Sequence, residues 1–145
     1  MEIYSIGFTQ KSASGFFGTL KANGIERLLD VRLNNTSQLA GFAKQTDLPY
    51  FLREICGAAY EHEPLLAPTQ EILDAFKKHK GSWDVYTEAY LALIQSRKVE
   101  SVLSQERFQK KTVLLCGEPT AERCHRRLAL EYLQKNWGGV RIIHL

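Results

Sequence analysis

The chain has 145 residues, of which 44% are hydrophobic and 24% are charged, and its formal net charge at pH 7 is +3. This length and composition are typical of one soluble globular domain, so we expect residues 1–145 to fold as a single domain. The small positive charge falls short of the basic footprint of a dedicated nucleic-acid binder, although it permits contact with a small anion.

The first half of the chain alternates short apolar runs with segments of helical periodicity. Gly24 and Gly57 each follow a helical run and mark its end. The predicted elements are a strand at 3–7, a helix at 12–24, a strand at 27–32, a polar loop at 33–46, a helix at 47–56 and a strand at 59–63.

The second half continues the alternation. It predicts two or three helices over 69–108, a strand at 111–116, a long helix at 120–137 and a terminal strand at 140–145. Strands separated by helices form βαβ units with parallel strands. We therefore predict the α/β class, as a single three-layer domain with a mainly parallel, Rossmann-like five-stranded sheet and helices on both faces.

The N-terminal residues read as a strand, with no charged segment before an apolar one, and no apolar stretch approaches the length of a membrane span. These features predict a cytoplasmic protein without a membrane partner. The chain has three cysteines, Cys56, Cys116 and Cys124. In that compartment they are expected to be reduced thiols rather than a disulfide framework.

Polar side chains follow three of the predicted strands. Thr9 comes after the first, Asp30 and Arg32 end the second, and Cys116 and Glu118 end the fourth. Parallel sheets bind ligands outside the carboxyl ends of their strands, where the strand order reverses. We therefore expect these side chains to converge on one crevice.

The long helix at 120–137 buries one stripe, made of Leu128, Ala129, Tyr132, Leu133 and Trp137. Continued toward the N-terminus, this stripe passes through Glu122, His125 and Arg126, with Cys124 at its edge. An unpaired buried charge is very costly, so Arg126 needs an acid or an anionic ligand. We expect it to contact Asp30, directly or through a ligand.

Cys116 ends a strand just before a predicted helix N-terminus, a position that favours an anion. The helix end contributes only about 0.3–1 kcal/mol, whereas a shift of one pKa unit needs about 1.36 kcal/mol. An activated thiolate would therefore also need His125 or Arg126. Glu118 opposes activation because it adds negative charge.

Several other roles remain open for the thiols. Cys116 and Cys124 suit small buried hydrophobic residues, and they suit a reversible disulfide if they approach within about 7 Å. A zinc site with His125 has suitable ligand types, but neighbouring residues of one helix project about 100° apart, so no metal site is predicted.

Phosphate and cofactor signatures are incomplete or absent. A phosphatase-like cradle fits the order strand, cysteine, loop and helix. However, Glu118 occupies the loop, and six residues separate Cys116 from the next arginine, Arg123. The glycine patterns of dinucleotide and nucleoside triphosphate sites are missing, so the sequence identifies no cofactor.

Five motifs give the chain a family resemblance. They are IGFT at 6–9, LLDVR at 28–32, EAYLALI at 88–94, LLC-x-E at 114–118 and CHRRL-x-x-EYL at 124–133. Across nearly the whole chain these motifs resemble the bacterial and archaeal family called domain of unknown function 488. The resemblance implies a compact α/β fold and a site built from Asp30, Arg32, Cys116, Glu118, Cys124, His125 and Arg126.

The family's cysteines suggest an enzymatic function. The family usually has Gly-His-Ser or Gly-His-Thr after its first strand, whereas this chain has Gly7-Phe8-Thr9. In the absence of that histidine, proton transfer would fall to His125 or Glu118. Phe8 would instead suit a stacked aromatic or heterocyclic ligand.

We therefore hypothesise a small cytoplasmic enzyme acting on a polar or anionic small molecule, with nucleotide-related molecules as one candidate class. Cys116 would be the nucleophile or redox thiol, Glu118 the general acid–base group, and His125 the proton donor or orienting group. The expected substrate-binding residues are Thr9, Asp30, Arg32, Cys124 and Arg126.

Two alternatives lie in other functional classes. The first is a ligand-binding module that uses the same arginines without catalysis. The second is a nucleic-acid-processing accessory protein with a basic rim of Lys110, Lys111, Arg126 and Arg127, whose binding would weaken steeply with salt.

Overall fold

A computed structural model describes residues 1–145. Its five strands form one sheet in the order β3-β2-β4-β1-β5, and every pairing is parallel. The strands are β1 (Glu2–Gly7), β2 (Arg27–Asp30), β3 (Ala59–His62), β4 (Thr112–Cys116) and β5 (Arg141–His144). The predicted α/β class and parallel five-stranded sheet are confirmed.

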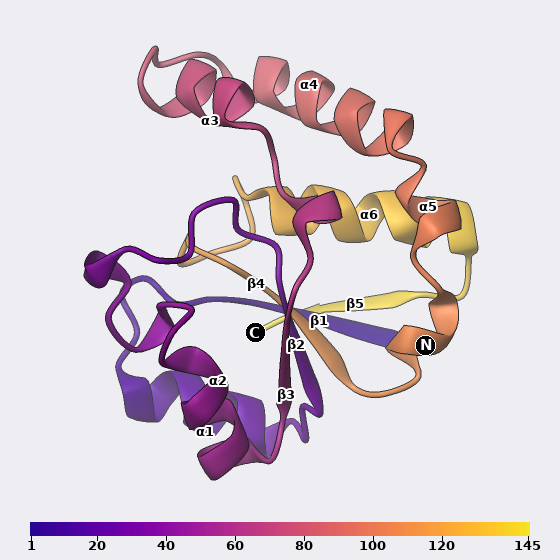
Figure 1. Cartoon of the computed structure of the whole chain (residues 1–145). Helices are drawn as coiled ribbons and strands as arrows, with labels where there is room; N and C mark the ends of the chain where they lie inside the picture. Colours follow the sequence, from indigo (N-terminus) through magenta and orange to yellow (C-terminus); the bar gives the residue numbers. More distant parts are fainter.

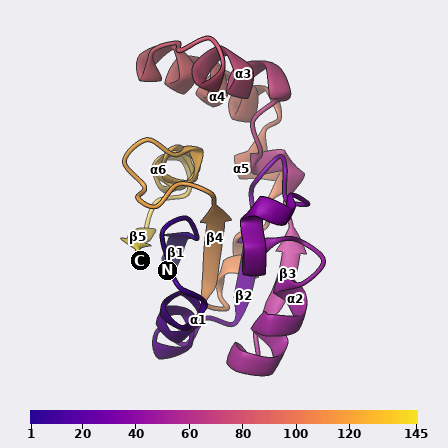
Figure 2. The same ribbon diagram turned by 90° about the vertical axis from the view of Figure 1, so that its left-hand side faces the viewer.

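Helices cover both faces of this sheet. They are α1 (Ala13–Ala22), α2 (Leu48–Phe51), α3 (Gln70–Lys77), α4 (Trp83–Ser96), α5 (Val99–Val102) and α6 (His125–Trp137). Figures 1 and 2 show α1 and α2 on one side of the sheet and α6 on the other, with α3 and α4 beyond α6. None of these helices is both long and apolar enough to cross a lipid bilayer.

The sheet separates two hydrophobic cores, because successive strand residues face opposite sides. Leu28 and Leu115 belong to the core under α1 and α2, whereas their neighbours Leu29 and Leu114 belong to the core under α6. Cys116, two residues after Leu114, also faces α6. This alternation decides which polar side chains can meet at the ends of the strands.

The neighbouring strands β1 and β4 are followed by helices on opposite faces of the sheet. Gly7 at the end of β1 pairs with Cys116 at the end of β4. From there β1 leads to α1 on one face, while β4 leads to α6 on the other (Figure 1). Such a switch point leaves a crevice at the sheet edge, and ligands of doubly wound sheets bind there.

Three differences from the sequence prediction bear on the site. The second strand ends at Asp30 rather than Arg32, and the segment 38–43 of the predicted loop forms a 3₁₀ turn. The long helix begins at His125 rather than residue 120, because Cys124 is extended, with φ −137° and ψ 140°. Residues 117–124 are therefore a loop, which brings Cys124 and His125 back over the end of β4.

Candidate active site

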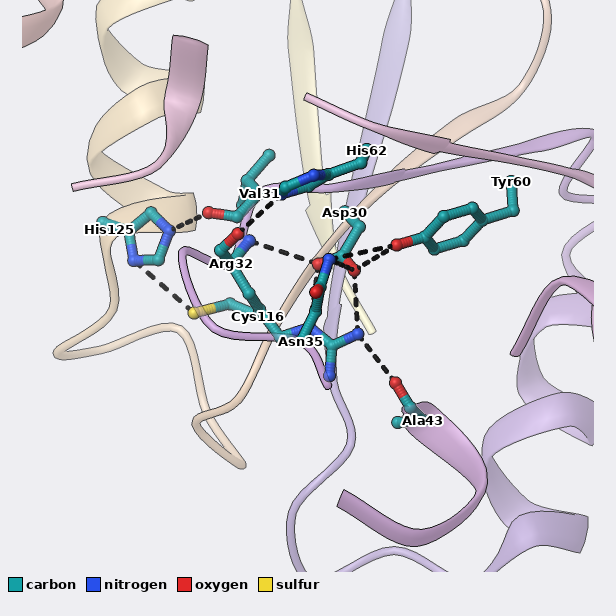
Figure 3. A network of polar contacts seen from close by, with 9 residues as sticks. All are labelled: Asp30, Val31, Arg32, Asn35, Ala43, Tyr60, His62, Cys116 and His125. Carbon is teal, nitrogen blue, oxygen red and sulfur yellow. Dashed lines mark hydrogen bonds and ion pairs between the residues drawn. The ribbon is translucent and has the colours of Figure 1, made fainter. Parts of the chain in front are cut away.

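Cys116 and His125 form a pair at the end of β4. The Cys116 sulfur lies 3.5 Å from His125 Nδ1, and both side chains are buried. On the other side of the imidazole ring, Nε2 lies 2.7 Å from the carbonyl oxygen of Val31, to which it donates (Figure 3). A neutral ring that donates through Nε2 has its Nδ1 lone pair free as an acceptor. His125 is thus oriented to take the proton of the Cys116 thiol.

The loop after Cys116 is held by two cations through its carbonyl groups. Arg126 Nη1 donates to the carbonyl of Glu118 at 2.9 Å, and Lys11 Nζ donates to that of Pro119 at 3.2 Å. The backbone N–H groups of Glu118 and Gly117 contribute to lowering the pKa of Cys116. The loop therefore presents amide donors to any negative charge that develops at Cys116.

Several donors together lower the pKa of the Cys116 thiol. The largest contribution is a hydrogen bond from Cys124, which is opposed by burial. The charge of Arg126 and the amides of Glu118 and Gly117 add to the lowering. Cys124 behaves in the opposite way, because burial and the neighbouring Cys116 raise its pKa. The two thiols thus have different protonation preferences within one site.

Arg126 is fully buried and has no carboxylate partner. Its Nε donates to the Ser5 hydroxyl at 3.2 Å and its Nη1 to the Glu118 carbonyl, whereas Nη2 has no hydrogen-bond partner. A buried cation without an acid requires another source of negative charge. A thiolate at Cys116 would be such a source, because the charge of Arg126 lowers the pKa of this thiol.

The direct contact expected between Asp30 and Arg126 does not form. Asp30 follows Leu28 by two residues and so lies on the α1 side of the sheet, whereas Arg126 of α6 lies on the opposite side. Asp30 pairs instead with Arg32. The Arg32 Nε lies 2.8 Å from Asp30 Oδ1, and its Nη2 lies 2.8 Å from Asp30 Oδ2. The partner of Asp30 therefore comes from its own strand end.

A polar network surrounds this buried ion pair (Figure 3). The Tyr60 hydroxyl donates to Asp30 at 2.6 Å, the Asn35 amide donates at 3.3 Å, and Arg32 also donates to the Ala43 carbonyl at 2.7 Å. Burial raises the pKa of Asp30, but the hydrogen bonds and charge of Arg32 and the hydrogen bond of Tyr60 outweigh it and lower the pKa overall. Asp30 thus fixes the position of Arg32.

A cavity of about 200 Å³ opens above the Cys116–His125 pair. Its floor includes Cys116, Cys124 and His125, and half of its lining residues are hydrophobic. The aromatic residues of its wall are Phe8 after β1, Phe76 on α3, and Trp83 and Tyr86 on α4. Because four of the 16 lining residues are aromatic, the cavity suits a ligand with a flat ring.

Charged groups stand around this aromatic wall. The Arg32 guanidinium lies 5.3 Å from the centre of the Phe8 ring, and the exposed Arg123 also lines the cavity. Glu118 forms an ion pair with Lys77 at 2.5 Å, and both side chains are about half exposed. Because Arg32 and Lys77 are ion-paired with Asp30 and Glu118, Arg123 is the lining cation without an ion pair, and it favours an anionic substituent beside the apolar wall.

The structure brings most of the predicted site residues together. Arg32, Cys116, Glu118, Cys124 and His125 all line the cavity. The other three lie around it: the Thr9 hydroxyl donates to the Gly117 carbonyl, and Asp30 and Arg126 are buried behind the cavity residues. These three support the site through other residues instead of lining the cavity.

The basic rim of the nucleic-acid alternative does not form. Lys110 and Lys111 precede β4, at the amino end of the strand, whereas Arg126 is buried beyond its carboxyl end. These residues share no surface.

The sequence argument against a metal site does not hold in the structure. The ligand atoms of Cys116, Cys124 and His125 all lie within 4.8 Å of one another. They converge because Cys124 is extended, so the splay expected of neighbouring helical residues does not arise. Thiolates and imidazole are ligands that zinc prefers, and the Nε2 contact with Val31 orients Nδ1 toward such an ion.

Sequence reasoning missed the wall that α3 and α4 supply. Phe76, Lys77 and Trp83 line the cavity, although Phe76 and Trp83 also pack against the core. Their helical spacing is that of ordinary core residues, so no local signal distinguished them. Lys11 was also missed, since its role depends on the folded position of the loop after Cys116.

Comparison with known proteins adds one match. The family model described as domain of unknown function DUF488 matches residues 12–133. No curated protein and no solved structure matches the chain.

Proposed function

We propose that this chain, which belongs to the DUF488 family, is a small enzyme that uses the Cys116 thiolate to attack a polar or anionic small molecule. The observation that carries the proposal is the Cys116–His125 pair, 3.5 Å apart, beside a buried guanidinium that has no carboxylate partner. Nucleophile, base and stabilising cation are the parts that thiol catalysis requires.

The reaction would begin with transfer of the Cys116 proton to His125 Nδ1. The sulfur electron pair then forms a bond to an electrophilic centre of the substrate, and the bond to the leaving group breaks. The leaving group takes the proton back from Nδ1. A hydrogen bond from Cys124, the charge of Arg126 and the amides of the loop at 117–118 stabilise the thiolate before the attack.

The cavity supports a ligand with a flat ring and an anionic substituent, as in nucleotide-related molecules. The aromatic wall provides stacking surfaces, while Arg123, which has no ion pair, provides positive charge beside the Asp30-paired Arg32. Glu118 lies at the mouth in its ion pair with Lys77, a position that suits proton exchange with a substrate group there. We place the enzyme in the cytoplasm, where thiols of this kind stay reduced.

Thiol labelling across a range of pH tests the proposal. Iodoacetamide is small enough for the cavity, and mass spectrometry reports the modification of each cysteine separately. We expect Cys116 to react fastest, with a midpoint below the ordinary thiol value of about 8.5. Cys56 is the internal control, because burial raises its pKa.

Equal, slow labelling of all three cysteines would contradict the proposal and favour a binding module without catalysis. Labelling of Cys116 that requires a chelator would contradict it in favour of a bound metal. A Cys116→Ser variant provides the matched background, and its thermal unfolding shows whether the fold is intact.

A further inference from the structure

Two thiols with different environments share one cavity. Cys116 and Cys124 both line it, their sulfur atoms lie within 4.8 Å, and they are free cysteines. The third cysteine, Cys56, contacts the Phe17 carbonyl of α1 on the other side of the sheet. Only Cys116 and Cys124 can therefore react with each other.

We propose that Cys116 and Cys124 form a redox pair toward hydroperoxides, in which Cys116 is oxidised and Cys124 resolves the product as a disulfide. This inference rests on the proposed function to the extent that both require a reactive Cys116 thiolate. It adds a second reactive residue and a second class of reactant.

The surroundings of the two sulfurs assign these roles. The Cys116 sulfur lies 3.5 Å from His125 Nδ1, and a hydrogen bond from Cys124, the charge of Arg126 and the loop amides lower the pKa of Cys116, which favours its thiolate. Burial and the adjacent Cys116 instead keep Cys124 protonated. Because the thiolate is the form that peroxides oxidise, Cys116 reacts first and Cys124 is retained as a thiol.

The chemistry balances in two steps. In the first, the Cys116 thiolate attacks the outer oxygen of a hydroperoxide, the O–O bond breaks, and the departing oxygen takes a proton to leave as an alcohol or water. Sulfur loses two electrons and becomes a sulfenic acid. In the second, the Cys124 sulfur attacks the Cys116 sulfur, an S–S bond forms, and the hydroxyl leaves as water with the Cys124 proton.

The backbone around Cys124 permits this closure. A disulfide requires the sulfurs to approach to about 2.05 Å, so one side chain must turn. Cys124 makes no side-chain capping hydrogen bond at the start of α6, and the loop at 117–124 contains neither helix nor strand. Its side chain can therefore rotate without loss of a cap. His125 Nδ1 lies close to both sulfurs and can carry the proton between them.

Peroxide treatment followed by tryptic mapping tests the pair. Trypsin cleaves after Lys111, Arg123 and Arg126, so Cys116 falls in peptide 112–123 and Cys124 in peptide 124–126. Reduced protein is treated with hydrogen peroxide, its remaining thiols are blocked with iodoacetamide, and the digest is analysed with and without dithiothreitol. We expect the wild type to yield these two peptides linked, and dithiothreitol to separate them.

Variants assign the two roles. We expect Cys124→Ser to lose the linked peptide and to accumulate a Cys116 sulfenic acid that dimedone traps. Cys116→Ser should give neither product, and Cys56→Ser should behave as wild type. The linked peptides are measured in the wild-type protein, so they test the redox pair even if a variant fails to fold.

Other outcomes separate this inference from the proposed function. Rapid iodoacetamide labelling of Cys116 with no linked peptide, and oxidation that continues to sulfinic acid in the wild type, would overturn the redox pair alone. A Cys116 that reacts with neither iodoacetamide nor hydrogen peroxide would overturn both the redox pair and the proposed function. A link that forms only after chelator treatment would overturn the pair in favour of a metal site.

Discussion

The imidazole of His125 faces the sulfur of Cys116 across 3.5 Å, although these residues stand at opposite ends of the loop 117–124. The contact exists because the end of β4 and the start of α6, which follow each other in sequence, also lie together at the edge of the sheet. The loop between them is held by Arg126, which binds the carbonyl of Glu118. Reactivity of Cys116 should therefore depend on Arg126 as well as on His125.

Replacing Arg126 by glutamine should raise the pKa of Cys116. The thiolate exists above that pKa and is lost as the pH falls through it, so removal of the neighbouring cation moves the loss to higher pH. Iodoacetamide labelling of Cys116 at neutral pH should become slower, and the midpoint of its pH profile should move upward. Arg127→Gln is the matched control, since Arg127 is the next residue of α6 and pairs with Glu131 at 3.8 Å. An unchanged midpoint in folded R126Q would contradict the role of Arg126.

Replacing Asp30 by asparagine should destabilise the fold. Asp30 is fully buried, and the change leaves the Arg32 guanidinium buried without its carboxylate. Breaking one side of a buried ion pair costs about 3–5 kcal/mol of unfolding free energy, which urea titration measures. Glu54→Gln removes the exposed pair with Arg53 and should cost about 0–1 kcal/mol. Equal effects of the two substitutions would refute the structural role of Asp30.

The same ion pair predicts a dependence of stability on pH. Burial raises the pKa of Asp30, yet Arg32 and Tyr60 outweigh it, so the folded pKa lies below the unfolded one. The resulting stabilisation is complete above the ordinary value of about 3.9 and is lost as the pH falls through the lower folded pKa. Urea titrations should show a smaller acid-induced loss for D30N than for the wild type. An equal acid-induced loss of unfolding free energy in D30N and the wild type would rule out Asp30 as a source of acid sensitivity.

The location of the site was predictable from sequence, whereas the pairing of its charges was not. Apolar runs that end in polar residues mark the carboxyl ends of strands, and parallel topology gathers those ends at one edge. Helices bury both faces of this sheet, so residues 28–31 are all buried and show no alternation. Without that alternation, nothing in the sequence placed Asp30 on the face opposite Arg126.

The local backbone of Cys124 is a second feature that the sequence did not reveal. Residues 120–137 have a continuous helical pattern, and no Ser, Thr, Asp or Asn lies between residues 121 and 124 to mark a later start. The helix begins late in the folded chain, after an extended Cys124, while Arg126 and Lys11 hold the carbonyls of the preceding loop. These contacts are tertiary, as are those that bring α3 and α4 over the cavity.

Treatment with a chelator should leave the reactivity of the Cys116 thiol unchanged. Arg126 already supplies a cation beside Cys116, so the thiolate needs no divalent ion for its stabilisation. We expect metal analysis of purified protein to find no stoichiometric zinc, and iodoacetamide labelling of Cys116 to be the same with and without a chelator. Stoichiometric zinc that protects Cys116 and Cys124 together would instead favour the three-ligand arrangement with His125.

Gly7 offers a test of the loop that faces Cys116. A Cβ at this position would lie 1.6 Å from the carbonyl oxygen of Glu118 and 3.1 Å from Arg126 Nη1. Gly7→Ala must therefore displace the Glu118 peptide, weaken its hydrogen bond from Arg126, and move the amides away from the sulfur. We expect a loss of about 1–3 kcal/mol in unfolding free energy, as for other overpacked sites, together with slower labelling of Cys116.

Gly18→Ala is the matched control for this substitution. No atom lies within 4 Å of a Cβ at Gly18, which is an exposed residue inside α1. Alanine there should stabilise the protein by about 0.5–1 kcal/mol, because it restricts the unfolded chain, and should leave the labelling of Cys116 unchanged. If folded G7A labels at the wild-type rate, the loop amides do not stabilise the thiolate, and its reactivity must come from Cys124, His125 and Arg126.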